Sequence, residues 1–328
     1  MVQIWAGTDI GKTHHHCVIL DAEGKRLLSR RVLNDEPELL VLLGDVLALD
    51  EDVVWAVDVA DGMAALWINV LLNHGQRLVY IPGLAVNRAS AGYRGMGKTD
   101  AKDATVIADQ ARMRRDLTVL RPDEENVVEL RILTDRRSDL NADRTRRINR
   151  LRGQLTSIFP ALERVLDLGN AGPLILLSGY QTPAALRRTG RARLETWLRN
   201  RKVRSADALA EAALEAAGHQ HTTVPGEKIT AQVIHTLAKE VMGLNEQIAE
   251  IDKLIAARFR EHELAEAISS MPGIGPLLGA EFLAATAGDM SRFGSSDRLA
   301  SFAGVAPVPR DSGNVSGNLH RPRRYHGP

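Results

Sequence analysis

The chain has 328 residues, of which 44% are hydrophobic and 25% charged, and this composition is ordinary for a folded protein of two or three domains. The net charge of +1 excludes a polycation, although the arginines are clustered and arginine clusters suit phosphate groups. A single cysteine excludes a disulfide framework, and there is no long apolar run or leader, so we expect a cytoplasmic protein without a membrane segment.

The first 120 residues alternate between strand and helix signals. We predict three strands joined by tight turns in WAGTDI, THHHCVILDAEGK and RLLSRRVL. There follow a helix (EPELLVLLGDVLAL), a strand (VVWAVDVA), a helix (MAALWINVLLNHG), a strand (RLVYIP) and a helix that begins near Asp100. This order predicts an α/β domain with a mixed sheet and helices on its faces, which is the order of the RNase H-like (RuvC-like) fold.

Four aspartates fall at the ends of these elements. Asp9 ends the first strand, and Asp58 lies at the same height in the next buried strand, where a carboxylate is unfavourable unless it is paired or binds a metal. Asp100 and Asp103 are three residues apart, so they lie on one face of the last helix. Such an oxygen-only cluster binds Mg²⁺, and two ions can activate the attacking oxygen and stabilise the leaving oxygen in phosphodiester chemistry.

Each of these features also has a purely structural interpretation. An acid at a strand end is commonly a solvated loop residue. Acids in a first helical turn favour the helix dipole, with Thr99 as the N-cap. The histidines at positions 14 to 16 look like a metal tag but lie on a predicted strand, where alternate side chains point to opposite faces, so we do not assign them a metal site.

Beyond Pro122 the pattern changes to long helices. Apolar residues at helical spacing occupy 123–166, and those from Ile234 to Ile255 repeat in alternating steps of three and four, as in a coiled coil. We expect the two helices to pack on each other. A sharper hypothesis adds self-association and phosphate contacts along the arginine-rich face of the first helix, through Arg144, Arg147 and Arg150. Residues 167–223 are alanine-rich and irregular, and we assign them only as a helical insertion.

The C-terminal segment contains PGIGP between two helical stretches. Gly273 and Gly275 resemble the turn of a helix-hairpin-helix module, where backbone N–H groups face a phosphate, although such glycines also form ordinary turns. We therefore predict three regions: an RNase H-like domain in 1–122, a coiled-coil region in 123–262, and a small, mostly helical C-terminal domain in 263–328.

The segments TDIGK, VVWAVDVADG and YRGMGKTDAKDATVIADQARMRRD resemble the N-terminal domain of IS110-type transposases, and the last segment is the most specific. PGIGP, DRLASFAGVAP and PRDSG resemble the second domain of the same family. The resemblance implies a DEDD tetrad with Mg²⁺ at Asp9, Asp58, Asp100 and Asp103. The second acid of the tetrad is often glutamate in this family. Here Asp58 occupies the matching position, and Asp61 is the less favoured alternative.

The resemblance further implies that Ser312 is a nucleophile on DNA. A serine hydroxyl needs support from a metal, a base or oxyanion donors. Cationic side chains near Ser312 in the sequence could hold the scissile phosphate, namely Arg310, His320, Arg321, Arg323 and Arg324. Without the resemblance, a serine in this Gly-Asn-Ser loop would be interpreted as a turn residue.

The function implied is that of an insertion-sequence transposase or site-specific recombinase that cuts and rejoins DNA. Similar proteins act as homo-oligomers, dimers or tetramers, and are directed by a guide RNA that the element encodes. With 4% aromatic residues, we expect binding to depend on phosphate contacts. Members of the family continue beyond HRPRRYH, so we expect a truncated copy with a mobile tail from about Ser312 and weak or absent strand transfer.

Two other protein classes remain open. TDIGK also resembles the phosphate-binding start of actin-like sugar kinases, which predicts a second Asp-Gly loop in a repeated half, and the sequence has no such loop. A non-catalytic nucleic-acid-binding protein would use the acids as helix caps and solvated charges. Titration with a metal ion distinguishes that class from the transposase.

Overall fold

The computed structural model of the chain describes residues 3–60, 62–93, 99–115, 117–120, 125–312, 316–317 and 319–322. These residues divide into two compact units, one formed by residues 1–123 and 290–328 and the other by residues 124–289. In the described part of the chain, no helix is both long and apolar enough to cross a membrane.

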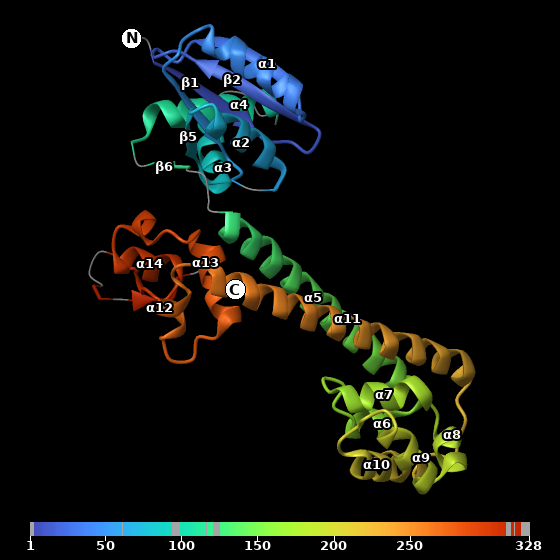
Figure 1. The fold of residues 1–328 in the computed structure, drawn as a ribbon. Coiled ribbons are helices and arrows are strands. Elements are labelled where there is room, and N and C mark those ends of the chain that lie inside the picture. Colours follow the sequence, from blue (N-terminus) through green and yellow to red (C-terminus); the bar gives the residue numbers. More distant parts are fainter. Residues whose placement is uncertain are drawn as a thin grey trace. The chain divides into compact units, whose positions relative to one another are not determined.

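The first part of the chain forms a six-stranded mixed sheet (Figure 1). Its strands are β1 (Ile4–Asp9), β2 (His14–Leu20), β3 (Arg26–Leu33), β4 (Val53–Val57), β5 (Arg77–Tyr80) and β6 (Thr118–Val119), in the spatial order β3-β2-β1-β4-β5-β6. The first three strands are antiparallel, β4 is parallel to β1, β5 is parallel to β4, and β6 is antiparallel to β5. This confirms the predicted RNase H-like order of a meander followed by parallel strands.

Helices cover both faces of the sheet. The 3-10 turn η1 (Gly62–Ala64) leads into α2 (Ala65–Asn73), which packs with α1 (Glu36–Leu47) on one face. On the other face lie α3 (Gly83–Ser90) and α4 (Asp100–Met113). Alternate side chains of each strand enter different cores on the two faces of the sheet. Ile4 and Ala6 of β1 pack toward α1 and α2, whereas Trp5 packs toward α3 and α4.

The histidines of β2 follow the same alternation. His15 is buried on the side of Cys17, and burial raises the pKa of the Cys17 thiol to about 12. His14 and His16 point to the opposite face, where their rings lie within hydrogen-bonding distance of Arg31 (3.2 Å) and the Ser29 hydroxyl (2.9 Å). The expectation that the three side chains divide between two faces is confirmed.

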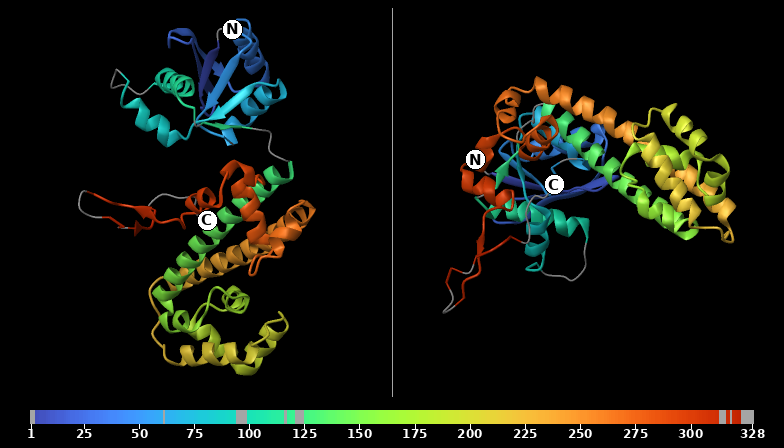
Figure 2. Two further views of the ribbon diagram at one scale, coloured as in Figure 1. Left: turned by 90° about the vertical axis from the view of Figure 1, so that its left-hand side faces the viewer. Right: turned by 90° about the horizontal axis from the view of Figure 1, so that it is seen from below.

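Two long helices dominate the second unit. They are α5 (Glu125–Ile158) and α11 (Glu227–Glu261), which lie side by side (Figures 1 and 2). They run antiparallel, because Arg137 near the start of α5 meets Asp252 near the end of α11, whereas Arg147 further along α5 meets Glu240. The predicted packing of the two helices on each other is confirmed.

The stretch between the two long helices is more regular than its sequence indicates. It contains five short helices: α6 (Pro160–Val165), α7 (Ala171–Gly179), α8 (Pro183–Thr189), α9 (Arg191–Arg199) and α10 (Ala206–Gly218). Their leucines and alanines form one buried cluster with the adjoining ends of α5 and α11. The predicted helical insertion is confirmed. Local periodicity does not predict the shared cluster, because its packing joins helices that are separate in the chain.

The second unit continues beyond α11. The short helix α12 (Ala265–Ser269) and α13 (Pro276–Thr286) share a core with α5 and α11, in which Phe259 lies so close to Gly279 that a Cβ atom there would come within 2.5 Å of its ring. The predicted domain boundary at residue 262 thus falls inside this unit, whose packing extends to Asp289. The remaining elements are η2 (Met290–Phe293), α14 (Ser296–Phe302), β7 (Val308–Pro309) and β8 (Leu319–His320).

Candidate active site

Asp9 and Asp58 lie side by side at the carboxyl edge of the sheet. Strands β1 and β4 pair in parallel with Ile4 opposite Val53 and Thr8 opposite Val57, and one further residue of the same register brings Asp9 opposite Asp58. Neighbouring strands are about 4.8 Å apart. Asp9 lies two residues beyond Gly7, and Asp58 two residues beyond Ala56, and both of these positions face the α3 and α4 side. Both side chains therefore point to that same face of the sheet, and both are half-buried.

Helix α4 reaches this edge because β1 has a glycine where the helix crosses it. A Cβ atom at Gly7 would lie 2.2 Å from the backbone nitrogen of Ala108 and 2.4 Å from the carbonyl oxygen of Ala104. Any larger residue would therefore push the helix away from the sheet. Gly7 was not singled out from the sequence, where an interior strand glycine is its only signal.

The N-terminus of α4 is defined by Thr99. The Thr99 hydroxyl accepts a hydrogen bond from the Lys102 backbone N–H at 3.2 Å, which caps the helix so that Asp100 and Asp103 lie in its first turn. Carboxylates in a first turn are stabilised by the helix dipole. The predicted start of the helix is confirmed.

The charge of Asp100 acts on His16 of strand β2. His16 pairs with Asp9 in the antiparallel ladder between β1 and β2. Burial lowers the pKa of His16, and the charge of the Asp100 carboxylate acts in the opposite direction, which requires Asp100 to be nearby. Asp103, on the same helix, is half-buried. Acids that end β1, follow β4 and begin α4 thus occur at this end of the sheet, and His16 lies opposite one of them, Asp9.

The acidic side chains at this edge do not enclose one ion. Within the described ranges, no three His, Cys, Asp or Glu side chains are positioned to hold a metal together. Their chemistry nonetheless fits a hard divalent cation, because aspartate offers only oxygen ligands. Asp61, the alternative second acid, lies outside the described residues.

The PGIGP turn links α12 to α13. Gly273 has a φ of +82°, a conformation that favours glycine, and Gly275 is the N-cap of α13 without a side-chain cap. Both glycines are exposed, and a Cβ atom built at either would meet nothing within 4 Å. The turn therefore leaves its backbone open to solvent at a helix N-terminus.

Ser312 lies in the segment that connects the two strands of a small hairpin. In this hairpin, β7 and β8 pair with Val308 opposite His320 and Pro309 opposite Leu319 (Figure 2). Ser312, Arg310 and Arg321 are exposed. Arg323 and Arg324 lie outside the described residues, as does the rest of the tail from 323 to 328.

The three arginines predicted for nucleic-acid binding on α5 differ in their surroundings. Arg144 donates from Nε to the Asn245 side-chain oxygen at 2.6 Å and from Nη2 to the Gly169 carbonyl at 2.9 Å. Arg147 forms an ion pair with Glu240 of α11 at 2.9 Å. Arg150, by contrast, is exposed. Arg144 and Arg147 therefore contribute to helix packing, and Arg150 remains the better candidate for a phosphate contact.

Both ends of the chain match the sequence models of known protein families. Residues 6–160 match the IS110-type DEDD transposase family, described as a transposase, and residues 265–328 match a family described as "Transposase IS116/IS110/IS902 family". A solved structure of RuvC from Thermus thermophilus in complex with a Holliday junction substrate aligns with a TM-score of 0.29 and 17% identity, over 36% of this chain and 99% of that one.

Curated relatives match almost the whole chain. An uncharacterized 42 kDa protein of the insertion element IS900 of Mycobacterium paratuberculosis is 56% identical over 98% of this chain and 82% of its own length. An uncharacterized 44.8 kDa protein of the insertion element IS116 of Streptomyces clavuligerus is 53% identical over 98% of this chain and 81% of its own length. Because family models match both ends and these relatives match 98% of the chain, we conclude that the chain belongs to the IS116/IS110/IS902 family of transposases.

Proposed function

We propose that this transposase cuts and rejoins DNA, using Mg²⁺ held by carboxylates at the sheet edge and Ser312 as a nucleophile. The observation that carries the proposal is the parallel register that brings Asp9 beside Asp58, at the edge where α4 begins with Asp100. Three of the acids, Asp9, Asp58 and Asp103, are half-buried, and a surface with no chemical role would not be expected to hold half-buried acids on three elements.

Asp9, Asp58, Asp100 and Asp103 would hold the metal. Bound Mg²⁺ supplies positive charge that stabilises oxygen anions in phosphodiester exchange. Because no three of these side chains are yet positioned for one ion, the proposal requires the first turn of α4 to approach the strand carboxylates when the substrate is bound. The protein's own contribution is to keep Asp9, Asp58 and Asp103 half-buried at one end of the sheet, where a bound cation would offset their charges.

Ser312 would form the covalent link to DNA. Its Oγ would attack the scissile phosphorus, so that an Oγ–P bond forms and the bond from phosphorus to the leaving sugar oxygen breaks. The hydroxyl proton of Ser312 leaves during attack, and the sugar oxygen gains a proton to depart as a hydroxyl. Arg310 and Arg321, with His320 and with Arg323 and Arg324 of the tail, would bind the non-bridging oxygens.

DNA is the proposed substrate, and further contacts would come from the open glycine turn and from Arg150. The N–H groups near Gly273 and Gly275 suit a backbone phosphate at the start of α13.

We also propose a homo-oligomer directed by an element-encoded guide RNA. The low aromatic content supports the guide RNA: a protein that binds DNA mainly through phosphate contacts does not itself select a sequence, so another component would have to do so.

The test combines purified chain, a plasmid with the element's own ends and the RNA transcribed from them. Wild-type protein should form a covalent protein–DNA adduct in Mg²⁺ but not in EDTA. Asp9→Asn, Asp58→Asn and Ser312→Ala should each abolish the adduct, whereas Asp45→Asn, a surface carboxylate paired with Arg30, should retain it. Full activity of Asp9→Asn would refute the carboxylate assignment, and an adduct in Ser312→Ala would refute the nucleophile.

A second candidate function is nucleic-acid binding without catalysis. The open spacing of the carboxylates favours it, since the described side chains do not form a ready-made metal site. Calorimetric titration with Mg²⁺ separates the two candidates. Heat of binding that disappears in Asp9→Asn supports the transposase chemistry, and no heat in the presence of DNA supports the binding protein.

A further inference from the structure

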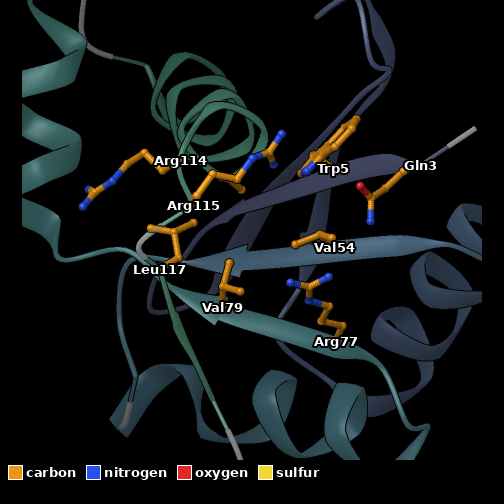
Figure 3. Close-up of a pocket in the computed structure, with 9 residues that line it drawn as sticks. Gln3, Trp5, Val54, Arg77, Val79, Arg114, Arg115 and Leu117 are labelled. Atoms are coloured by element: carbon orange, nitrogen blue, oxygen red, sulfur yellow. The ribbon is translucent and has the colours of Figure 1, made fainter. Parts of the chain in front are cut away.

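A second feature of the sheet domain lies at the end of the sheet away from the carboxylates. There, the starts of β1, β4 and β5 and the end of α4 line a pocket of about 100 Å³ (Figure 3). A cavity of this size holds several water molecules and is large enough for a phosphate group. Its floor is apolar and includes Trp5, Val54 and Val79.

Arginines from two different elements border the pocket. Arg77 comes from the start of β5, Arg114 and Arg115 follow the last turn of α4, and Figure 3 shows Val54 between Arg77 and Arg115. Arg77 and Arg115 are exposed and form no ion pair with any residue in the described part of the chain. Guanidinium groups that border one pocket repel one another, and an anion that lies among them offsets this repulsion.

The helix dipole explains only part of this arrangement. Cations after the last turn of a helix are stabilised by its negative end, and this accounts for Arg114 and Arg115. It does not account for Arg77, which belongs to a strand. The planar forks of arginine match phosphate oxygens, and an apolar floor beside them provides a surface for the adjoining base.

We infer that this pocket binds a backbone phosphate of a nucleic-acid strand, held by Arg77 and Arg115, at a site separate from the carboxylate edge. Trp5 and Asp9 are four residues apart on β1, which is about 13 Å along a strand. Asp100 and Arg115 lie at opposite ends of α4, which is roughly 20 Å long. The arginines therefore hold a different phosphate from the one at the carboxylates. The inference does not depend on the proposed catalytic chemistry.

Fluorescence anisotropy in EDTA tests this site without any cleavage. The probes are a single-stranded DNA and a single-stranded RNA of the same sequence, each titrated with full-length protein over a range of salt concentrations. Arg77→Gln combined with Arg115→Gln should weaken binding about tenfold or more. It should also lower the salt slope by about 1.4, since each lost phosphate contact on a single strand contributes about 0.7.

Two further variants make the test specific. Leu117→Trp fills the pocket but keeps all its arginines, so it should weaken binding without a loss of charge. Arg188→Gln combined with Arg193→Gln removes two exposed arginines from α8 and α9 of the other unit and should bind as the wild type does. Thermal unfolding of each variant checks that the protein is folded.

The outcomes separate the possible sources of the phosphate. Weakened binding of one probe or of both, in the folded pocket variants alone, supports the site and identifies whether DNA, RNA or either strand occupies it. Wild-type affinity in the double pocket variant would overturn the inference. An equal loss in the control variant would also overturn it, because the effect would then be one of overall charge.

Discussion

Gly7 of β1 and Ala108 of α4 meet backbone to backbone, since a Cβ atom at Gly7 would lie only 2.2 Å from the Ala108 nitrogen. The contact buries Ala104 and Ala108 against β2, and Asp100 at the start of the same helix is near enough for its charge to act on His16 of β2. A glycine without catalytic chemistry thus positions one of the proposed metal ligands.

Replacing this glycine should therefore affect both the fold and the site. We expect Gly7→Ala to destabilise the chain by about 1–3 kcal/mol, because the extra methyl group overpacks a backbone contact that cannot yield. Urea unfolding measures the change. Gly44→Ala, where a Cβ atom meets nothing within 4 Å on helix α1, is the matched control and should be neutral or stabilising by up to about 1 kcal/mol. Equal effects at the two positions would contradict the close contact.

Asp103→Asn should weaken Mg²⁺ binding and leave the fold intact. The substitution removes one ligand charge from the carboxylates at the edge, and it relieves like-charge repulsion in the metal-free protein, so the melting temperature should be unchanged or higher. Calorimetric titration with Mg²⁺ measures the affinity, with Asp45→Asn as the control for a surface carboxylate in the same domain. Unchanged Mg²⁺ affinity in Asp103→Asn would remove this residue from the metal site.

The arginines of α5 should separate into two groups by experiment. Arg150→Gln and Arg152→Gln, both on exposed positions, should lower the salt slope of duplex DNA binding by about one unit per lost phosphate contact, without loss of stability. Arg144→Gln should instead lower the free energy of unfolding by about 1 kcal/mol, because it removes hydrogen bonds to Asn245 and to the Gly169 carbonyl. If Arg150→Gln and Arg152→Gln leave the slope unchanged, these two arginines are only solvated.

Cys17 should make stability fall at alkaline pH. Burial raises the pKa of its thiol from 9.0 to about 12 in the folded chain, so the unfolded chain releases this proton first as the pH rises. The contribution is fully present below about pH 9 and is lost between that pH and about 12, at up to roughly 1.4 kcal/mol per pH unit. Unfolding by urea at pH 8, 9 and 10 should show a steeper decline for the wild type than for Cys17→Ala. Parallel declines would contradict the buried thiol.

Local sequence signals are sufficient for several of these elements. Thr99 before Asp100 predicts where α4 begins, because capping involves only neighbouring residues. The alternation in β2 predicts that His15 and His16 face opposite sides, because it follows from the geometry of a single strand. Helix α3 could not be predicted from local signals, because it is short and polar and Val86 is its one buried residue. The two-residue strand β6 is recognisable only from its pairing with β5.

Sequence by itself determined the order of β1 to β5 with α1, α2 and α4, the acids at the ends of β1, β4 and α4, and the family to which the chain belongs. Tertiary structure decided which of these residues meet. The register that brings Asp9 opposite Asp58 depends on pairing between residues 49 positions apart, as 58 − 9 = 49. Arg144 and Arg150 are equivalent in the sequence, yet only Arg144 reaches a partner on α11, and Arg77 and Arg115 come together only when β5 and α4 pack on the same sheet. Local periodicity reflects the geometry of one element, whereas these contacts arise from burial of apolar surface between elements distant in the chain.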